Sequence, residues 1–415
     1  MAHPARGDEV VNDLPSVSLA DIEAARALQS GVVITTPLQH SRWLSDWVGS
    51  PVFLKCENLQ RAGSFKIRGA IVRMSRLSED ERAHGVVAAS AGNHAQGVAL
   101  AAQQLGMKAT VFMPVGASIP KEKATRRYGA QVRVVGHSVD EALVAANEYA
   151  AETGAVLIHP FDHKDIVAGQ GTCGLEILEQ CPDVKTVVVS LGGGGLLAGI
   201  ATAVKALRPD VRVVGVQAEQ AAAYPRSLQL EEPTAITDMA TMADGIAVGC
   251  PGAIPFAAVQ RNVDQVMTVS EESLSSALLM LLERAKMVVE PAGAAGVAAL
   301  LDAPAACTGP TVVVLSGGNV DPLLLMAVIR HGLAAGRRYL SVQVRIPDRP
   351  GALARLLGQL AEAEANVLDV VHQRTSAQLH LDEVDVALQV ETRGPEHCDS
   401  VAAQLRAAGY PVTFS

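Results

Sequence analysis

The chain has 415 residues, of which 49% are hydrophobic, and this length favours two or three domains with a large apolar core. Aromatic residues make up 3% of the chain, so the core is mainly aliphatic. The formal net charge is -9 and no long basic run occurs, which excludes the basic surface typical of nucleic-acid-binding proteins.

Three further features bear on the compartment. Residues 1–14 carry acidic side chains and no apolar segment of the signal-peptide type. Residues 187–204 lack charge, but three valines followed by four glycines favour a buried strand, a turn and a helix over a membrane span. The cysteines form no C-x-x-C pair, so no zinc cluster and no disulfide framework is predicted. We therefore expect a cytoplasmic protein that binds neither membranes nor nucleic acid.

The first part of the chain contains a lysine in an unusual setting. A helix is predicted over residues 18–29, a strand over 52–55 and a helix over 67–75. Before the second helix lies the segment 63–69 (GSFKIRG), in which Lys66 stands among small residues and an aromatic ring. Partial desolvation favours the neutral amine, which can form a Schiff base, so Lys66 is a candidate for covalent catalysis. A surface lysine at a helix start is the alternative.

Strands then alternate with helices along the chain. Strands are predicted at residues 86–89, 109–113, 131–135, 156–159, 186–190, 211–217 and 311–315, and helices at 95–105, 121–128, 139–153 and 196–207. Most of these strands are apolar throughout, which is typical of parallel sheets covered by helices on both faces. The predicted fold class is therefore α/β with open parallel sheets.

Small-residue loops follow predicted strands at residues 90–94 (SAGNH), 192–196 (GGGGL) and 316–319 (SGGN). In open parallel sheets, ligands bind at the carboxyl ends of strands. Four glycines let backbone N–H groups approach an anion, and the following helix adds its positive end. The glycine loop lacks the P-loop and dinucleotide signatures, so it favours a phosphate of another kind. A tight turn that needs small residues is the alternative.

A Schiff-base lysine and a phosphate-binding loop together are what pyridoxal phosphate requires. The motifs of this chain resemble those of the fold-type-II pyridoxal-phosphate enzymes, and their order and spacing resemble the threonine ammonia-lyase (threonine dehydratase) family. They lie at residues 64–69 (SFKIRG), 90–94 (SAGNH), 192–196 (GGGGL), 290–294 (EPAGA) and 316–319 (SGGN). The resemblance covers about residues 15–333 and implies two lobes, the smaller one, about residues 55–160, being inserted in the larger.

The resemblance also implies residue roles. Lys66 would bind pyridoxal 5'-phosphate as a Schiff base and then act as the base at the substrate Cα. The other cofactor-binding residues would be Phe65 against the ring, Asn93 at the ring hydroxyl, Gly192, Gly193, Gly194, Gly195 and Leu196 at the phosphate, Gly245 against the other ring face and Ser316 at the pyridine nitrogen. The substrate carboxylate would be bound by Ser90, Ala91, Gly92, Asn93 and His94.

Particular positions narrow the reaction. A serine at position 316 does not keep a proton on the pyridine nitrogen as a carboxylate would, which favours β-elimination over transamination. Ala91 replaces the serine that acts as a second acid/base in serine racemases of this fold, so racemisation is not expected. Gln217 and Ala223 match the acidic ligands of the divalent-metal site in those racemases, so we expect no metal site.

After residue 338 the pattern changes to alternating strands. Strands are predicted at residues 342–346, 367–371, 384–390 and 411–414, and helices at 352–363 and 395–408, which is the βαββαβ order of a ferredoxin-like domain. Residues 348–353 (DRPGAL) resemble the ACT domains, which bind amino-acid effectors at a domain interface. We expect a catalytic domain at 15–335, an ACT-type regulatory domain at 339–415, and a homodimer or homotetramer. A dimerisation module without a ligand is the alternative.

These expectations predict a pyridoxal-phosphate-dependent β-elimination. L-threonine would give 2-oxobutanoate and ammonia, L-serine would give pyruvate, and an amino acid bound to the ACT domain would regulate the rate. Two alternatives stay open: a serine-preferring dehydratase, and an amino-acid-binding regulatory protein without turnover. Steady-state rates on both amino acids distinguish a serine-preferring dehydratase from a threonine-preferring one. A visible absorption band of bound cofactor argues against a regulatory protein without turnover.

Overall fold

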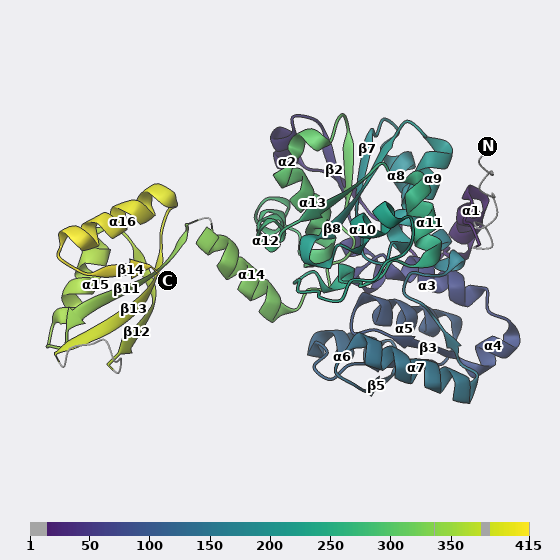
Figure 1. The fold of residues 1–415 in the computed structure, drawn as a ribbon, viewed down its shortest axis with the longest axis horizontal. Coiled ribbons are helices and arrows are strands. Elements are labelled where there is room, and N and C mark those ends of the chain that lie inside the picture. Colours follow the sequence, from purple (N-terminus) through teal and green to yellow (C-terminus); the bar gives the residue numbers. More distant parts are fainter. Residues whose placement is uncertain (1–14, 336, 375–381, 415) are drawn as a thin grey trace, which may run out of the picture. The chain divides into compact units, whose positions relative to one another are not determined.

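The computed structural model describes residues 15–335, 337–374 and 382–414 (Figure 1). The chain divides into two compact units, one ending at Asp321 and the other running from Pro322 to Ser415. The second unit thus includes α14 (Pro322–Ala335), which lies within the range expected for the catalytic domain. The domain limits at residues 335 and 339 stay a prediction.

The larger sheet of the first unit has the strand order β1-β2-β10-β7-β8-β9. Its strands are β1 (Leu38–His40), β2 (Val52–Lys55), β7 (Thr186–Ser190), β8 (Arg212–Ala218), β9 (Gln265–Val269) and β10 (Thr311–Val314). Neighbouring strands are parallel, except that β1 pairs antiparallel with β2 at the edge. Both β7 and β10 are buried along their whole length, as a sheet covered on both faces requires.

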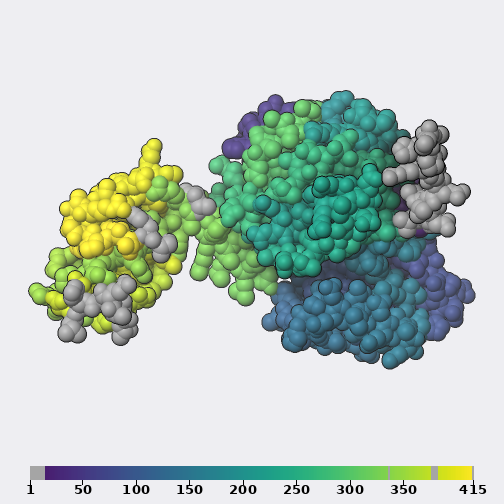
Figure 2. Space-filling view, viewed as in Figure 1, coloured from purple at the N-terminus to yellow at the C-terminus, as the bar shows by residue number. Residues whose placement is uncertain are grey.

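The smaller sheet has the strand order β5-β4-β3-β6 and is parallel throughout. Its strands are β3 (Val86–Ala89), β4 (Ala109–Met113), β5 (Gln131–Val134) and β6 (Val156–Leu157). All of them lie in sequence between β2 and β7, so the smaller sheet is an insertion between two strands of the larger one. In the space-filling view the blue surface of this segment adjoins the teal and green surface of the larger sheet and its helices (Figure 2).

Helices cover the faces of both sheets (Figure 1). Those of the first unit are α1 (Leu19–Leu28), α2 (Arg42–Val48), α3 (Lys66–Ser75), α4 (Glu79–His84), α5 (Asn93–Leu105), α6 (Ile119–Arg127), α7 (Val139–Thr153), α8 (Lys164–Gln180), α9 (Gly195–Leu207), α10 (Ala223–Leu230), α11 (Ala253–Asn262), α12 (Glu271–Met280) and α13 (Pro291–Asp302). Helix α3 packs between α5 and α8. Glycines allow this close approach: a Cβ on Gly169 of α8 would lie 2.5 Å from the Arg68 carbonyl oxygen.

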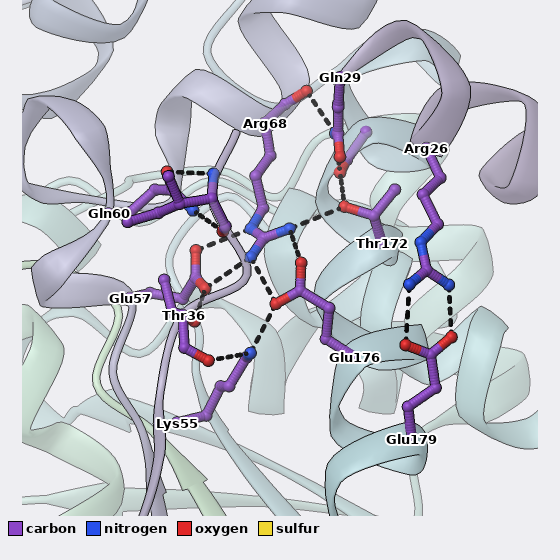
Figure 3. A network of polar contacts seen from close by, with 12 residues as sticks. Arg26, Gln29, Thr36, Lys55, Glu57, Gln60, Arg68, Thr172, Glu176 and Glu179 are labelled. Atoms are coloured by element: carbon purple, nitrogen blue, oxygen red, sulfur yellow. Dashed lines mark hydrogen bonds and ion pairs between the residues drawn. The ribbon is translucent and has the colours of Figure 1, made fainter. Parts of the chain in front are cut away.

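Buried charged side chains join α3 to the strand β2 and to α8 (Figure 3). The fully buried Arg68 donates from Nε and Nη2 to the two oxygens of Glu57, at 2.8 Å each, and to Glu176 at 2.8 and 2.9 Å. Lys55 Nζ also donates to Glu176, at 2.5 Å. Burial alone would raise the pKa of Glu57, but the Arg68 guanidinium holds it below its usual value. These bonds anchor the helix that begins at Lys66.

The second unit carries an antiparallel sheet in the order β12-β13-β11-β14. Its elements after α14 are β11 (Tyr339–Pro347), α15 (Ala352–Glu362), β12 (Asn366–Gln373), β13 (Glu383–Glu391), α16 (Pro395–Ala407) and β14 (Val412–Phe414). Alternate residues of β11 and β13 are buried and pack with Leu356 and Leu360 of α15. Each such aliphatic side chain contributes roughly 1.5–3 kcal/mol when fully buried. The predicted βαββαβ order is confirmed.

Most elements predicted in the first unit are also confirmed. The strands at 52–55, 86–89, 109–113 and 186–190 and the helix at 139–153 have the predicted bounds. Helix α5 begins earlier than predicted, at Asn93, because the N–H of Gln96 already bonds to the carbonyl of Gly92. Strand β9 and the helices α2, α4, α8 and α10 to α14 are not predicted from the sequence pattern. Within the described residues, no helix has both the length and the apolar character needed to cross a membrane.

Candidate active site

Two of the sequence motifs are joined directly by backbone bonds. The N–H of Phe65 donates to the carbonyl of Ser316 at 3.1 Å, and the N–H of Gly318 donates to Gly63 at 2.9 Å. Ser64 and Gly317 form an isolated antiparallel bridge between them. The segment before Lys66 is therefore held against the loop that follows β10, at the carboxyl edge of the larger sheet.

Lys66 is the first residue of α3. Its Nζ donates to the carbonyl of Pro160 at 3.1 Å and lies 5.1 Å from the centre of the Phe65 ring. Desolvation lowers the pKa of the amine to about 8, while the carboxylate of Glu290 acts in the opposite direction. A Cβ on Gly97 of α5 would lie 3.1 Å from the Lys66 backbone, so a larger residue there would displace the lysine. Lys66 is thus a desolvated amine on a closely packed backbone.

The loop after β3 leads directly into α5. The N–H of Gly92 donates to Ser90 Oγ at 3.1 Å, which shapes the turn, and Ala91 lies in the same half-buried loop. The first N–H groups of a helix have no partner within it, so the start of α5 presents donors for an anion. His94 is 4% exposed, and its Nε2 lies 2.7 Å from the Ile158 carbonyl oxygen. Burial lowers the pKa of His94 to about 3, so the ring is neutral at physiological pH.

Asn93 brings the loops together. Its Nδ2 donates to Glu290 Oε1 at 2.6 Å, and its Oδ1 accepts from Asn319 Nδ2 at 2.9 Å. Asn319 also donates to the carbonyl of Ala62, at 2.7 Å. The side chain predicted to meet a ring hydroxyl is therefore held by residues from the 290–294 and 316–319 motifs.

The glycine loop begins after β7 and ends in α9, which starts at Gly195 with Leu196 next to it. Gly194 has φ +99°, a conformation that favours glycine, and a Cβ there would overlap the hydroxyl of Tyr224. A Cβ on Gly193 would overlap the ring of Phe161, and one on Gly192 would lie 2.9 Å from the backbone of Ile246. The turn therefore requires glycines, and the first N–H groups of the helix that follows have no partner within that helix.

Two further predicted residues lie near these loops. Ser190 Oγ donates to Ser316 Oγ at 3.0 Å, which leaves the Ser316 proton for another acceptor. A Cβ on Gly245 would lie 2.9 Å from the Ala292 side chain and 3.7 Å from Glu290 Oε1. Gly245 therefore lies beside the motif that contains Glu290.

This arrangement fits the cofactor that the resemblance implies. Among the described residues, eight buried side-chain oxygen and nitrogen atoms have no hydrogen-bond partner, and two of them, Ser64 Oγ and Glu290 Oε2, belong to the motifs of the site, where a bound group can satisfy them. The glycine turn suits a phosphate, and the desolvated Lys66 amine suits an aldehyde. The residues present therefore fit pyridoxal phosphate.

Polar contacts also join residues near α6, beside the smaller sheet, to segments that belong to the larger sheet's part of the site. Lys121 of α6 pairs with Asp244 at 2.7 Å, next to Gly245. Ser118, just before α6, donates to Asp321 Oδ2 at 2.6 Å. These four residues have no role predicted from the sequence, because their partners are more than 120 positions away. Asn319 lies in the 316–319 motif, but no role is predicted for it from the sequence.

Gln217 and Ala223, the two residues expected at the positions of metal ligands, have other places in the fold. Gln217 is buried, accepts from the N–H of Tyr224 at 2.9 Å and lies 3.4 Å from the Ala221 carbonyl oxygen. Ala223 begins α10. In the described part of the chain, His, Cys, Asp and Glu side chains form no cluster of three that could hold a metal ion.

Comparison with known proteins agrees with this geometry. The sequence model of the family "Pyridoxal-phosphate dependent enzyme" matches residues 30–318. L-threonine ammonia-lyase of Thermotoga maritima is 45% identical over 396 residues, which cover 95% of this chain and 99% of that protein. L-threonine ammonia-lyase of Geobacter sulfurreducens is 47% identical, with 91% of this chain and 94% of that protein covered.

Solved structures show the same fold. A threonine deaminase from the organism abbreviated T.th. superposes with a TM-score of 0.70 and is 43% identical, covering 73% of this chain and 99% of its own. Maize serine racemase superposes with a TM-score of 0.72 at 34% identity and covers 78% of this chain and 100% of its own.

Proposed function

The chain belongs to the family of pyridoxal-phosphate-dependent enzymes, and on that premise we propose that it is a lyase that converts L-threonine to 2-oxobutanoate and ammonia. The Cα proton and the Cβ hydroxyl leave as water to give an enamine, which takes up a proton at Cβ and becomes the imine. One water then hydrolyses the imine to 2-oxobutanoate and releases ammonia. The observation that carries the proposal is the similarity over 95% of the chain to an L-threonine ammonia-lyase. The desolvated amine of Lys66 beside the joined motifs supports it.

The cofactor-binding residues follow from the positions of the motifs. Lys66 would hold the aldehyde carbon, and the turn 192–195 with Leu196 would hold the phosphate through backbone N–H groups. Asn93 would donate to the ring hydroxyl and Ser316 would donate to the ring nitrogen. Phe65 and Gly245 would lie against the two ring faces. When bound, pyridoxal phosphate withdraws electrons from Cα and so acidifies its proton.

The protein's own groups would then position the substrate and move one proton. Ser90 and the N–H groups at the start of α5 would bind the carboxylate and direct the Cα–H bond toward Lys66. An amine with a lowered pKa can accept that proton near neutral pH. Ala91 presents only a methyl group, so it cannot return a proton to the opposite face. Elimination is favoured over racemisation for this reason.

L-serine is the second candidate substrate. It undergoes the same elimination to give pyruvate, and the similarity to a serine racemase supports binding of its side chain. A serine-preferring dehydratase would have a higher kcat/KM on serine than on threonine.

The test is steady-state turnover of the purified holoenzyme on both amino acids. We expect 2-oxobutanoate from threonine with the higher kcat/KM, and a visible absorption band from bound cofactor. Lys66→Ala should lose that band and at least about 100-fold in kcat, because the variant lacks the amine and its general-base function. Wild-type turnover by Lys66→Ala, or a colourless and inert wild-type protein, would contradict the proposal.

Regulation and assembly form the second part of the proposal. An amino-acid effector would bind the ACT-type unit near the loop that leads into α15, where Gly351 adopts φ +84°. The chain would assemble as a homodimer or homotetramer in the cytoplasm. The βαββαβ order of the second unit supports the ACT assignment, and cysteines that form no disulfide fit a reducing compartment.

A further inference from the structure

The Asn93 amide is fixed at both of its ends by side chains from other segments. Asn319 donates to its oxygen at 2.9 Å, and its nitrogen donates to Glu290 Oε1 at 2.6 Å. A rotation of the amide by half a turn would break both bonds. The remaining N–H of Asn93 is therefore held in one direction, which lowers the entropic cost of a further hydrogen bond.

Glu290 is more than an acceptor for Asn93. It is 2% exposed, and its Oε2 has no hydrogen-bond partner among the residues that the structure describes. A buried carboxylate oxygen without a partner is costly, whereas a protonated carboxyl has a donor that it can offer to a bound molecule. A Cβ on Gly317 would overlap Oε1, so the glycines of the 316–319 loop make room for this carboxyl group.

Charged groups from several elements act on Glu290. Burial and the carboxylate of Asp244 raise its pKa to about 7, against the opposing effects of Lys121, the Asn93 hydrogen bond and Lys66. Lys121 comes from α6, Lys66 from α3 and Asp244 from the segment beside Gly245. Glu290 thus changes its charge within the pH range of ordinary enzyme assays.

We propose that Glu290 is a positioning residue that fixes the Asn93 amide through Oε1 and carries an exchangeable proton on Oε2 at the cofactor. The neutral form donates a hydrogen bond into the site. The ionised form adds a negative charge that stabilises positive charge at Lys66. The inference rests on the proposed function only for the identity of the cofactor, because it concerns the bound cofactor before substrate is added.

The test is a pH titration of the visible spectrum of the holoenzyme without substrate, from about pH 6 to 8, around the value at which Glu290 titrates. The wild type should show a spectral transition in this interval. Glu290→Gln can still accept from Asn93 but cannot ionise, so the transition should disappear. Asn319→Ala releases the other end of the amide and leaves Glu290 intact, so it should keep the transition and weaken the dissociation constant of pyridoxal phosphate about tenfold. Glu148→Gln, at an exposed position of α7, is the matched control.

A transition that persists in Glu290→Gln would overturn the proposal, and so would unchanged cofactor affinity in Asn319→Ala. If Glu290→Gln does not bind cofactor, Glu290→Asp decides: its shorter carboxyl should shift the midpoint, and an unchanged midpoint overturns the proposal. The spectral titration and the cofactor affinity can both be measured without turnover of substrate. A wild type that binds cofactor but leaves threonine unchanged would therefore contradict the proposed function and leave the spectral result readable.

Discussion

At the scale of single residues, the site depends on groups whose chemistry is altered by burial. The pKa of the Lys66 amine is lowered to about 8 and the pKa of the Glu290 carboxyl is raised to about 7. In both cases desolvation is the largest cause. Desolvation disfavours the charged form of either group. The same burial keeps the His94 ring neutral, with its Nε2 bonded to the carbonyl of Ile158. A residue type alone therefore does not determine its role here.

The lowered pKa of Lys66 has a consequence for the stability of the cofactor-free protein. Between about pH 8 and its usual value of 10.5, the unfolded chain binds more protons than the folded one, so the free energy of unfolding rises with pH. At pH 7 the buried, charged Lys66 ammonium lowers the free energy of unfolding. Lys66→Met should therefore raise Tm at pH 7 by about 2 °C or more, and the gain should shrink toward pH 10. Calorimetry on both proteins checks this, with the exposed Lys123→Met as control. A gain that grows with pH would contradict the assignment.

At the scale of elements, the glycine turn between β7 and α9 is held by two separate constraints. Gly194 has a positive φ, and a Cβ there would overlap the Tyr224 hydroxyl. Gly116 also has a positive φ, +87°, but a Cβ there would contact nothing within 4 Å. Comparing alanine variants at the two glycines therefore distinguishes the effect of backbone strain alone from the effect of strain with steric overlap.

We predict that Gly194→Ala weakens the dissociation constant of pyridoxal phosphate at least about tenfold, because both the backbone and Tyr224 must shift. Gly116→Ala should leave that constant unchanged and cost about 1–2 kcal/mol of stability. Spectroscopic titration with cofactor measures both. Equal affinity in the two variants would show that the turn does not contact the phosphate.

The buried charge network of α3, β2 and α8 makes a second prediction at this scale. Arg68→Met leaves Glu57 and Glu176 without their shared partner in the core, which should cost about 3–5 kcal/mol. Arg126→Met removes a partly exposed ion pair with Glu122 and should cost at most about 1 kcal/mol. Denaturant unfolding of the holoenzymes compares them. A similar loss in both variants would mean that the network contributes no more than a surface pair.

The pattern of apolar strands and glycine turns predicted most elements of both units. Helix α8 was not predicted, because its glycines and polar residues interrupt the helical repeat of apolar positions. This helix nevertheless contributes Glu176 to the buried charge network and Gly169 to the packing against α3. Small residues in α8 are explained by the helices they touch, and these contacts are long-range. Local pattern therefore predicts an element less well where its composition is set by packing against another helix.

At the scale of the whole molecule, our proposal places catalysis and regulation in separate units. The motifs of the site all lie before Asp321, and the antiparallel sheet lies after Pro322. Deleting residues 339–415 should leave turnover of threonine measurable and remove any response to isoleucine, valine or another amino-acid effector. Rates with and without each amino acid, on the full chain and the shortened one, test this. Regulation that survives the deletion would place the sensor elsewhere.

The sequence by itself determined the type of chemistry. A lysine after an apolar strand, a four-glycine turn and a serine-glycine-glycine-asparagine loop are local features, and their order along the chain indicated the family and the cofactor. Ala91 led to the expectation of no racemisation, and Gln217 and Ala223 to the expectation of no metal site, since each residue is read directly from the chain.

Only the tertiary structure decided how these groups act on one another. The clamp on Asn93 from Asn319 and Glu290, and the Lys121–Asp244 pair, join residues far apart in sequence. The altered pKa values of Lys66 and Glu290 arise from burial and from neighbours brought close by folding. Desolvation and electrostatic interaction depend on distance in space, so the sequence could name the candidates, while the fold set their proton affinities and orientation.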